Sequence, residues 1–234
     1  MNSLLESAVA AHGGLDRWNQ VKSITVDASI TGALWAVKSK GDALKDVRFE
    51  VDTTRERLTM DFTGQDKRSV FEPHRVVVQR GDGTLIEARD DPERSFDGHQ
   101  FETPWDDVHL AYFVGEAQWT YVNMPFLATR PGFVTQEITP IDVDGETWRR
   151  LEVTFPDGIK SHTRQQVFCF GPDGLLRRHD FAIDLLGGVP SQLSATGYRD
   201  VNGIVIPTER RAYDQLSPDH PLMVAIDMSK IALR

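Results

Sequence analysis

The sequence predicts a mainly β protein built as one antiparallel meander, with a helix at its start and a helical insert near its middle. Apolar residues alternate with polar ones over most of the chain, the period expected of half-buried strands. Tight-turn sequences such as "DVDGE", "FPDG" and "GPDG" recur at short intervals. Residues 103–130 lack the alternation and are rich in large apolar side chains, which indicates a helical segment instead.

The first element is a helix in "NSLLESAVAAHGG". Asn2 or Ser3 can cap its start, and apolar residues from Leu4 to Val9 recur at helical spacing. The glycines of "HGG" end it, because glycine readily takes the left-handed conformation at which helices stop. A short second turn is expected in "LDRWNQV".

Strands are expected next. "SITVDASITGALWAV" alternates from Ile24 to Leu34, which also places Trp35 in a strand. Residues 47–51 and 58–62 form two more alternating segments around a polar turn. In "KRSVFEPHRVVVQRGDGTLIEAR", the "GDG" turn between alternating segments indicates a hairpin.

The insert at 103–130 is expected to act as a lid. Thr103 can cap a helix that begins at Pro104 and Trp105, with two acids in its first turn. A second short helical piece is expected within "EAQWTYVNMPFLAT". An insert this apolar must bury itself against the sheet.

After residue 132 the turns delimit six further strands, and no linker or repeat interrupts them, so we expect a single domain over 1–234. The strands are "TWRRLEVTF", "SHTRQQVFCF", "LLRRHDFAIDLL", "QLSATGYRDV", "IVIPTERRAYD" and "LMVAIDMSKIAL".

Composition limits the function. Thirty-five acidic against 26 basic residues give a net charge of −9, which disfavours nucleic-acid partners and anionic membrane surfaces. No run approaches the roughly 18 apolar residues of a membrane span, so no stable membrane insertion is expected. Cys169 is the one cysteine, and the N-terminus lacks the basic and apolar regions of an export signal. We therefore expect a cytoplasmic protein.

The order of elements, the opening "AHGGLDRWNQVKSI" and the closing "GYRDVNGIVIPTERRAY" resemble the bacterial lipoprotein-carrier superfamily, the LolA/LolB-like proteins. The resemblance implies a curved antiparallel sheet that forms a half-barrel, covered by the terminal helix and the insert around an apolar cavity. The chain resembles a branch without an export signal or an early lipidation cysteine, so the likeness suggests the cavity more than lipoprotein transport.

His179 is the first candidate for chemistry. In "RRHDFAIDLL" it shares a strand face with Phe181, Ile183 and Leu185, whereas Asp180 points to the opposite face and cannot orient the ring. A histidine on an apolar face can act as an acid or base, because its ordinary pKa lies near neutrality, or it can simply be structural. His162 is expected to lie far from it along the strand ladder.

Two functions stay open. The first is binding of a hydrophobic small molecule of acyl, polyketide or terpenoid type in the cavity. The second is a cofactor-independent enzyme, an isomerase, cyclase, dehydratase or hydrolase, that acts on such a ligand with His179 as acid or base. No metal or cofactor motif is present, and partner proteins are not indicated. The predicted ligand contacts are Trp105, His109, Tyr112, Phe113, Trp119, Phe181 and Tyr198.

Overall fold

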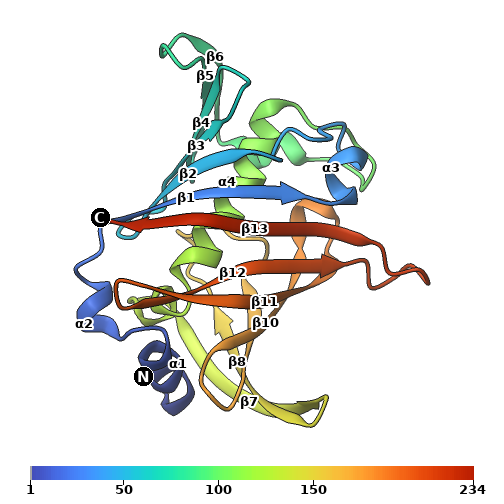
Figure 1. Cartoon of the computed structure of the whole chain (residues 1–234). Coiled ribbons are helices and arrows are strands. Elements are labelled where there is room, and N and C mark those ends of the chain that lie inside the picture. The colour runs from blue at the N-terminus through green and yellow to red at the C-terminus, as the bar shows by residue number, and fades with distance from the viewer. Residues whose placement is uncertain (1) are drawn as a thin grey trace.

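A computed structural model describes residues 2–234 and contains one 13-stranded antiparallel sheet. The strand order is β6-β5-β4-β3-β2-β1-β13-β12-β11-β10-β9-β8-β7, so β1 and the last strand β13 meet in the middle. The sheet curls but does not close into a barrel: β6 and β7 are its two edge strands and do not pair with each other (Figure 1). The predicted mainly β class with its terminal and central helices is confirmed.

The strands are β1 (Ser23–Thr31), β2 (Val47–Asp52), β3 (Leu58–Phe62), β4 (Lys67–Glu72), β5 (Arg75–Gln79), β6 (Leu85–Asp90), β7 (Val134–Val143), β8 (Glu146–Thr154), β9 (Gln165–Phe170), β10 (Leu176–Ile183), β11 (Val189–Val201), β12 (Ile204–Tyr213) and β13 (Leu222–Leu233). The α-helices are α1 (Ser3–Ala11), α2 (Leu15–Trp18), α3 (Ala33–Val37) and α4 (Asp107–Asn123). Short 3-10 turns are η1 (Pro92–Phe96), η2 (Phe126–Thr129) and η3 (Asp184–Leu186).

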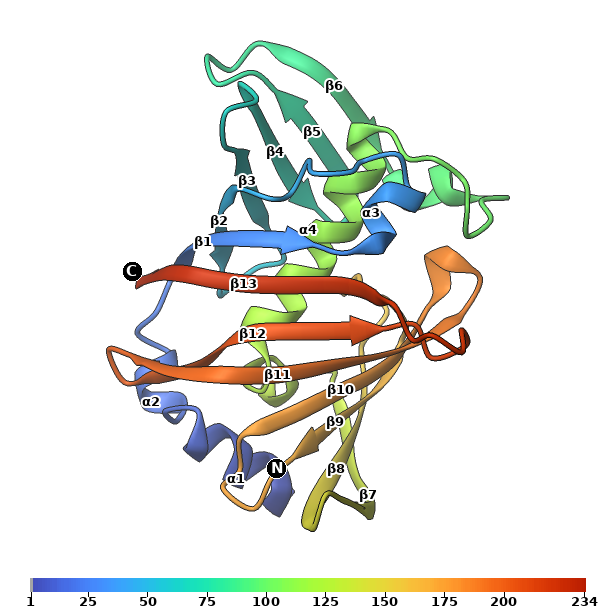
Figure 2. The same ribbon diagram turned by 45° about the vertical axis from the view of Figure 1, so that its right-hand side comes forward.

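Helix α4 runs through the inside of the curved sheet (Figure 2). Every residue from Val108 to Asn123 is buried, so all faces of this helix are covered, not one stripe. A helix that is buried all round belongs to a core. The insert is therefore the central helix around which the sheet wraps, and it closes the concave side from within.

The two ends of the curved sheet are covered differently. At one end, α1 and α2 pack beside the β9–β10 and β11–β12 turns, as Figure 1 shows. The fit is close: a Cβ atom on Gly13, which has φ +117°, would lie 2.1 Å from the Gly203 carbonyl oxygen. At the opposite end lie α3, the β10–β11 turn and the β12–β13 loop.

The predicted end of the first strand, which the alternation pattern extends to Leu34 and Trp35, is wrong. Strand β1 ends at Thr31, and Leu34 and Trp35 lie in helix α3. Gly32 makes the turn, with φ +123° and no room for a Cβ beside the Met223 carbonyl. Short apolar runs fit strand and helix equally well, which is why the pattern misled.

The central helix also begins later than predicted. It starts at Asp107 and not at Pro104, because the side chain of Asp106, not that of Thr103, accepts the His109 backbone N–H. The helix then continues to Asn123 without the break that two helical pieces would require.

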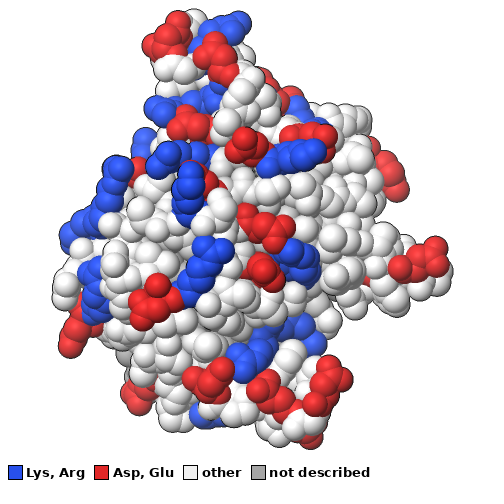
Figure 3. Space-filling model, in the orientation of Figure 1, with Lys and Arg blue, Asp and Glu red and all other residues white. Residues whose placement is uncertain are grey.

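On the side of the molecule that Figure 3 shows, charges of both signs are interspersed. Ion pairs between neighbouring strands account for some of them, such as Arg211 with Asp227 and Arg149 with Glu137. Within residues 2–234, none of the helices has the length and apolar character that crossing a bilayer takes.

Candidate functional site

An apolar cavity lies between α4 and the inner faces of β1 and β10 to β13. Its deeper part, here called the inner chamber, has a volume of about 40 Å³. Its wall contains Ile30, Leu34, Trp35, Phe113, Val114, Ala117, Gln118, Tyr121, His162, Phe181, Ile183, Ser191, Leu193, Ala212, Val224 and Ile226. Most of these side chains are apolar, so the chamber suits a hydrocarbon group.

A wider space of about 280 Å³, here called the mouth, adjoins the inner chamber. The two share five wall residues: Leu34, Ile183, Ser191, Ala212 and Val224. The mouth lies at the end of the sheet opposite α1, where Tyr213 and Leu216 are 46% and 73% exposed. The cavity thus runs from an apolar, solvent-facing rim to the core.

Polar side chains gather at the inner end. Nδ1 of His162 is hydrogen-bonded to a side-chain oxygen of Glu116 over 2.8 Å, and Nε2 is hydrogen-bonded to the Tyr121 hydroxyl over 3.0 Å. All three residues are buried. Burial raises the pKa of the Glu116 carboxyl and of the Tyr121 phenol. The result is a hydrogen-bonded chain that starts at a buried acid and ends at a hydroxyl on the chamber wall.

Arg210 is a buried cation beside the same chamber. Its side chain is 3% exposed, and its Nη2 donates to the Tyr121 carbonyl over 2.9 Å. Its Nε and Nη1 have no hydrogen-bond partner within residues 2–234. Burial lowers the pKa of the guanidinium, yet arginine stays charged in proteins.

His179 faces inward, as the strand pattern predicts, and is fully buried. Its ring stacks on Phe168 with centroids 4.1 Å apart, and its Nε2 donates to the Gln166 side-chain oxygen over 2.6 Å. Asp180 points to the outer face, where it pairs with Arg178. Burial first, then the charge of Arg210, lowers the pKa of His179 well below its ordinary value. The ring lies next to the chamber rather than in its wall.

Two of the predicted ligand contacts, Phe113 and Phe181, lie in the wall of the inner chamber. The other aromatic groups are engaged elsewhere. Trp119 donates to the Asp52 and Arg55 carbonyls, and Tyr198 donates to the Leu176 carbonyl.

The remaining candidates lie near the start of α4. Tyr112 packs on Phe71, with centroids 5.6 Å apart, and Trp105 packs on Phe113, with centroids 4.9 Å apart. Neither lines the mouth or the inner chamber.

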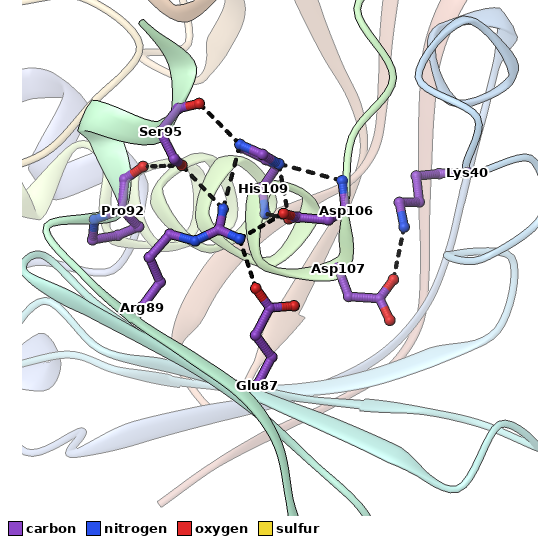
Figure 4. Close-up of polar contacts among 8 residues, drawn as sticks. All are labelled: Lys40, Glu87, Arg89, Pro92, Ser95, Asp106, Asp107 and His109. Atoms are coloured by element: carbon purple, nitrogen blue, oxygen red, sulfur yellow. Dashed lines mark hydrogen bonds and ion pairs between the residues drawn. The ribbon is translucent and has the colours of Figure 1, made fainter.

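His109 belongs to the N-terminal cap of α4 (Figure 4). Its Nδ1 accepts from the Asp106 backbone N–H, and its Nε2 lies 3.1 Å from the Ser95 carbonyl. Arg89 bridges Glu87 and Asp106 beside it. The structure thus places His109 in a network that fixes the helix start.

Sequence reasoning missed Glu116, His162 and Arg210. His162 and His179 both contact the Phe181 ring, with centroids 4.9 and 4.4 Å apart, so the expectation that they lie far apart is wrong. His162 precedes β9 in a loop that folds back toward α4. The pairing register of β9 and β10 therefore does not determine its distance from His179. Arg210 carried a usable signal: it alternates with Thr208 and Ala212 on the inward face of β12.

No family model matches the sequence, and no curated protein matches it. Solved structures do match. A putative outer membrane lipoprotein-sorting protein domain from Vibrio parahaemolyticus has a TM-score of 0.59 at 8% identity, covering 99% of this chain and 91% of that one. A DUF1329 family protein from Desulfovibrio piger has a TM-score of 0.58 at 14% identity, covering 99% and 92%.

A LolA superfamily protein from Nitrosomonas europaea is similar to the same extent, with a TM-score of 0.55 at 12% identity over 99% of this chain and 92% of that one. At such identities the likeness concerns the fold alone. The resemblance read from the order of elements is thus supported at the level of structure: the chain has a LolA-like fold.

Proposed function

We propose that the protein binds a hydrophobic small molecule of acyl, polyketide or terpenoid type in this cavity. One observation carries the proposal: the mouth and the inner chamber share apolar walls and lead from exposed Leu216 to the core. Each methylene group that leaves water for such a wall contributes about 0.8 kcal/mol. A chain of several methylenes can therefore bind without any polar contact.

A cavity-filling variant tests the proposal. Ser191 lies where the mouth meets the inner chamber, so Ser191→Phe should block the passage. The neighbouring Gln192 points to the other face of β11, and Gln192→Phe adds the same ring there as a matched control. We expect N-phenylnaphthylamine, a neutral fluorescent probe, to bind wild type and Gln192→Phe but at least tenfold more weakly to Ser191→Phe. Equal binding by all three would contradict the proposal.

A second function, a cofactor-independent enzyme, is favoured by the chain from Glu116 through His162 to Tyr121. Such an arrangement can deliver or remove a proton at the chamber wall, where a bound ligand would lie. His179, the acid or base expected from the sequence, is a second candidate beside the chamber.

Mass spectrometry of protein purified from its natural host would identify a bound ligand, which can then be incubated with the variants. Conversion by wild type that falls about a hundredfold in His162→Gln, with binding retained, supports catalysis through this chain. A comparable fall in His179→Phe assigns that role to His179. Unchanged ligand in every sample supports a binding protein.

A further inference from the structure

Among residues 2–234, Arg210 is the arginine that is buried in the core, and it lies on β12 beside the cavity. No Asp or Glu of residues 2–234 forms an ion pair with it, and only one of its three nitrogens has an acceptor. A buried charge without a counter-charge is costly, so buried charges are normally paired. A partner from outside the chain would remove this cost.

The position of Arg210 puts that partner at the inner end of the cavity. Arg210 pairs across strands with Ile226 and lies two residues from Ala212 on the same face of β12. Its guanidinium lies 5.2 Å from the centre of the Tyr121 ring. Ile226, Ala212 and Tyr121 all belong to the wall of the inner chamber.

A second polar atom without a partner lies close by. Gln166 donates its side-chain N–H to the Thr163 carbonyl, which turns its oxygen toward His179 Nε2. The proton of the neutral His179 ring is therefore on Nε2, and Nδ1 presents a free lone pair that no group of residues 2–234 satisfies. Both His179 and Arg210 flank the Tyr121 ring, at 5.8 and 5.2 Å.

We infer that the ligand is an amphiphile with a carboxyl head group, which enters head first and pairs with Arg210 while its apolar tail fills the chamber and the mouth. This inference rests on the proposed binding function. A carboxyl group fits because its oxygens match the planar N–H donors of arginine. His179 Nδ1 is an acceptor and does not bond to an ionised carboxylate, so the pairing rests on Arg210. The apolar wall between the rim and Arg210 suits the tail, and Tyr213 and Leu216 at the rim contact its free end.

Ligands that differ only in the head group test this directly. Calorimetric titration of wild type with fatty acids and with the alcohols of equal length, from octyl to hexadecyl, compares the two heads on one tail. We expect the acid to bind roughly tenfold to a hundredfold more tightly, the usual advantage of a hydrogen bond to a charged group. Arg210→Met should abolish this preference and leave alcohol binding within about threefold of wild type.

Arg211→Met is the matched control, because Arg211 points to the outer face and pairs with Asp227. It should keep the preference for the acid. Equal affinity of acid and alcohol for wild type would overturn the inference and leave the binding function intact. Failure of both series at every length would overturn the binding function as well. If Arg210→Met does not fold by circular dichroism, the wild-type comparison still decides.

Discussion

The Tyr121 hydroxyl and His162 Nε2 lie 3.0 Å apart, and this bond joins the central helix to the loop before β9. Glu116, one and a half turns earlier on the same helix, holds the other nitrogen of the ring. The imidazole is therefore clamped between two side chains of α4 in a fully buried setting. A clamp of this kind fixes where the helix lies along the sheet and keeps a polar face at the chamber.

Tyr121→Phe removes one partner and leaves His162 Nε2 buried without a hydrogen-bond partner. The cost of an unsatisfied buried polar atom is about 1–3 kcal/mol, so the free energy of unfolding in urea should fall by that amount. Tyr213→Phe, at the exposed rim, is the matched control and should change stability by less than about 0.5 kcal/mol. Equal effects of the two changes would show that the clamp does not stabilise the fold.

Glu56 should make stability depend on pH. Its carboxylate oxygens both lie 3.1 Å from the Lys160 backbone N–H, and burial raises its pKa from 4.5 to about 8. The folded state therefore holds a proton that the unfolded chain has lost, and stability decreases as pH rises between these two values.

Glu56→Gln keeps an oxygen for the Lys160 N–H but cannot ionise. At pH 5 the variant and wild type should unfold at similar urea concentrations. At pH 8 the variant should be more stable by a few kcal/mol, since each unit of pKa shift corresponds to about 1.4 kcal/mol. A difference that does not vary with pH would contradict the buried protonated state.

Gly115 sets how closely α4 approaches β4. A Cβ atom at this position would lie 2.4 Å from Cγ of Phe71, a fully buried ring. Alanine ordinarily favours a helix over glycine by about 1 kcal/mol, but forcing a methyl group into this contact costs about 1–3 kcal/mol. Gly115→Ala should therefore lower the melting temperature, whereas Gly158→Ala, whose added Cβ meets nothing within 4 Å, should not. A melting temperature raised by Gly115→Ala would contradict this contact.

Much of the sheet could be predicted from the sequence, because alternation and turn chemistry act locally. The inward face of His179 and the cap at Asn2 follow from such local signals, and the structure has both. The segment after Gly32 could not be read in this way, because its helix depends on a close approach to the Met223 backbone from a distant strand.

The site was harder to predict than the fold for the same reason. Its polar end joins Glu116, His162 and Arg210 from a helix, a loop and a late strand, and no spacing along the chain relates them. The aromatic insert suggested the ligand contacts instead. Most of the aromatic rings of the insert pack against the sheet or at the start of α4 instead of lining the cavity. They are buried because α4 is covered on every side.

Trp35 should be the fluorescent reporter of binding. Its ring is buried in the wall of the inner chamber, whereas Trp148 packs beside Arg178 on the outer face. An apolar ligand in the chamber changes the surroundings of the first indole and not of the second. Addition of decanol should shift the emission of wild type and of Trp148→Phe, and the shift should disappear in Trp35→Phe. A shift that survives Trp35→Phe but is lost in Trp119→Phe would instead place the ligand against the other side of α4, where Trp119 donates to the Asp52 and Arg55 carbonyls.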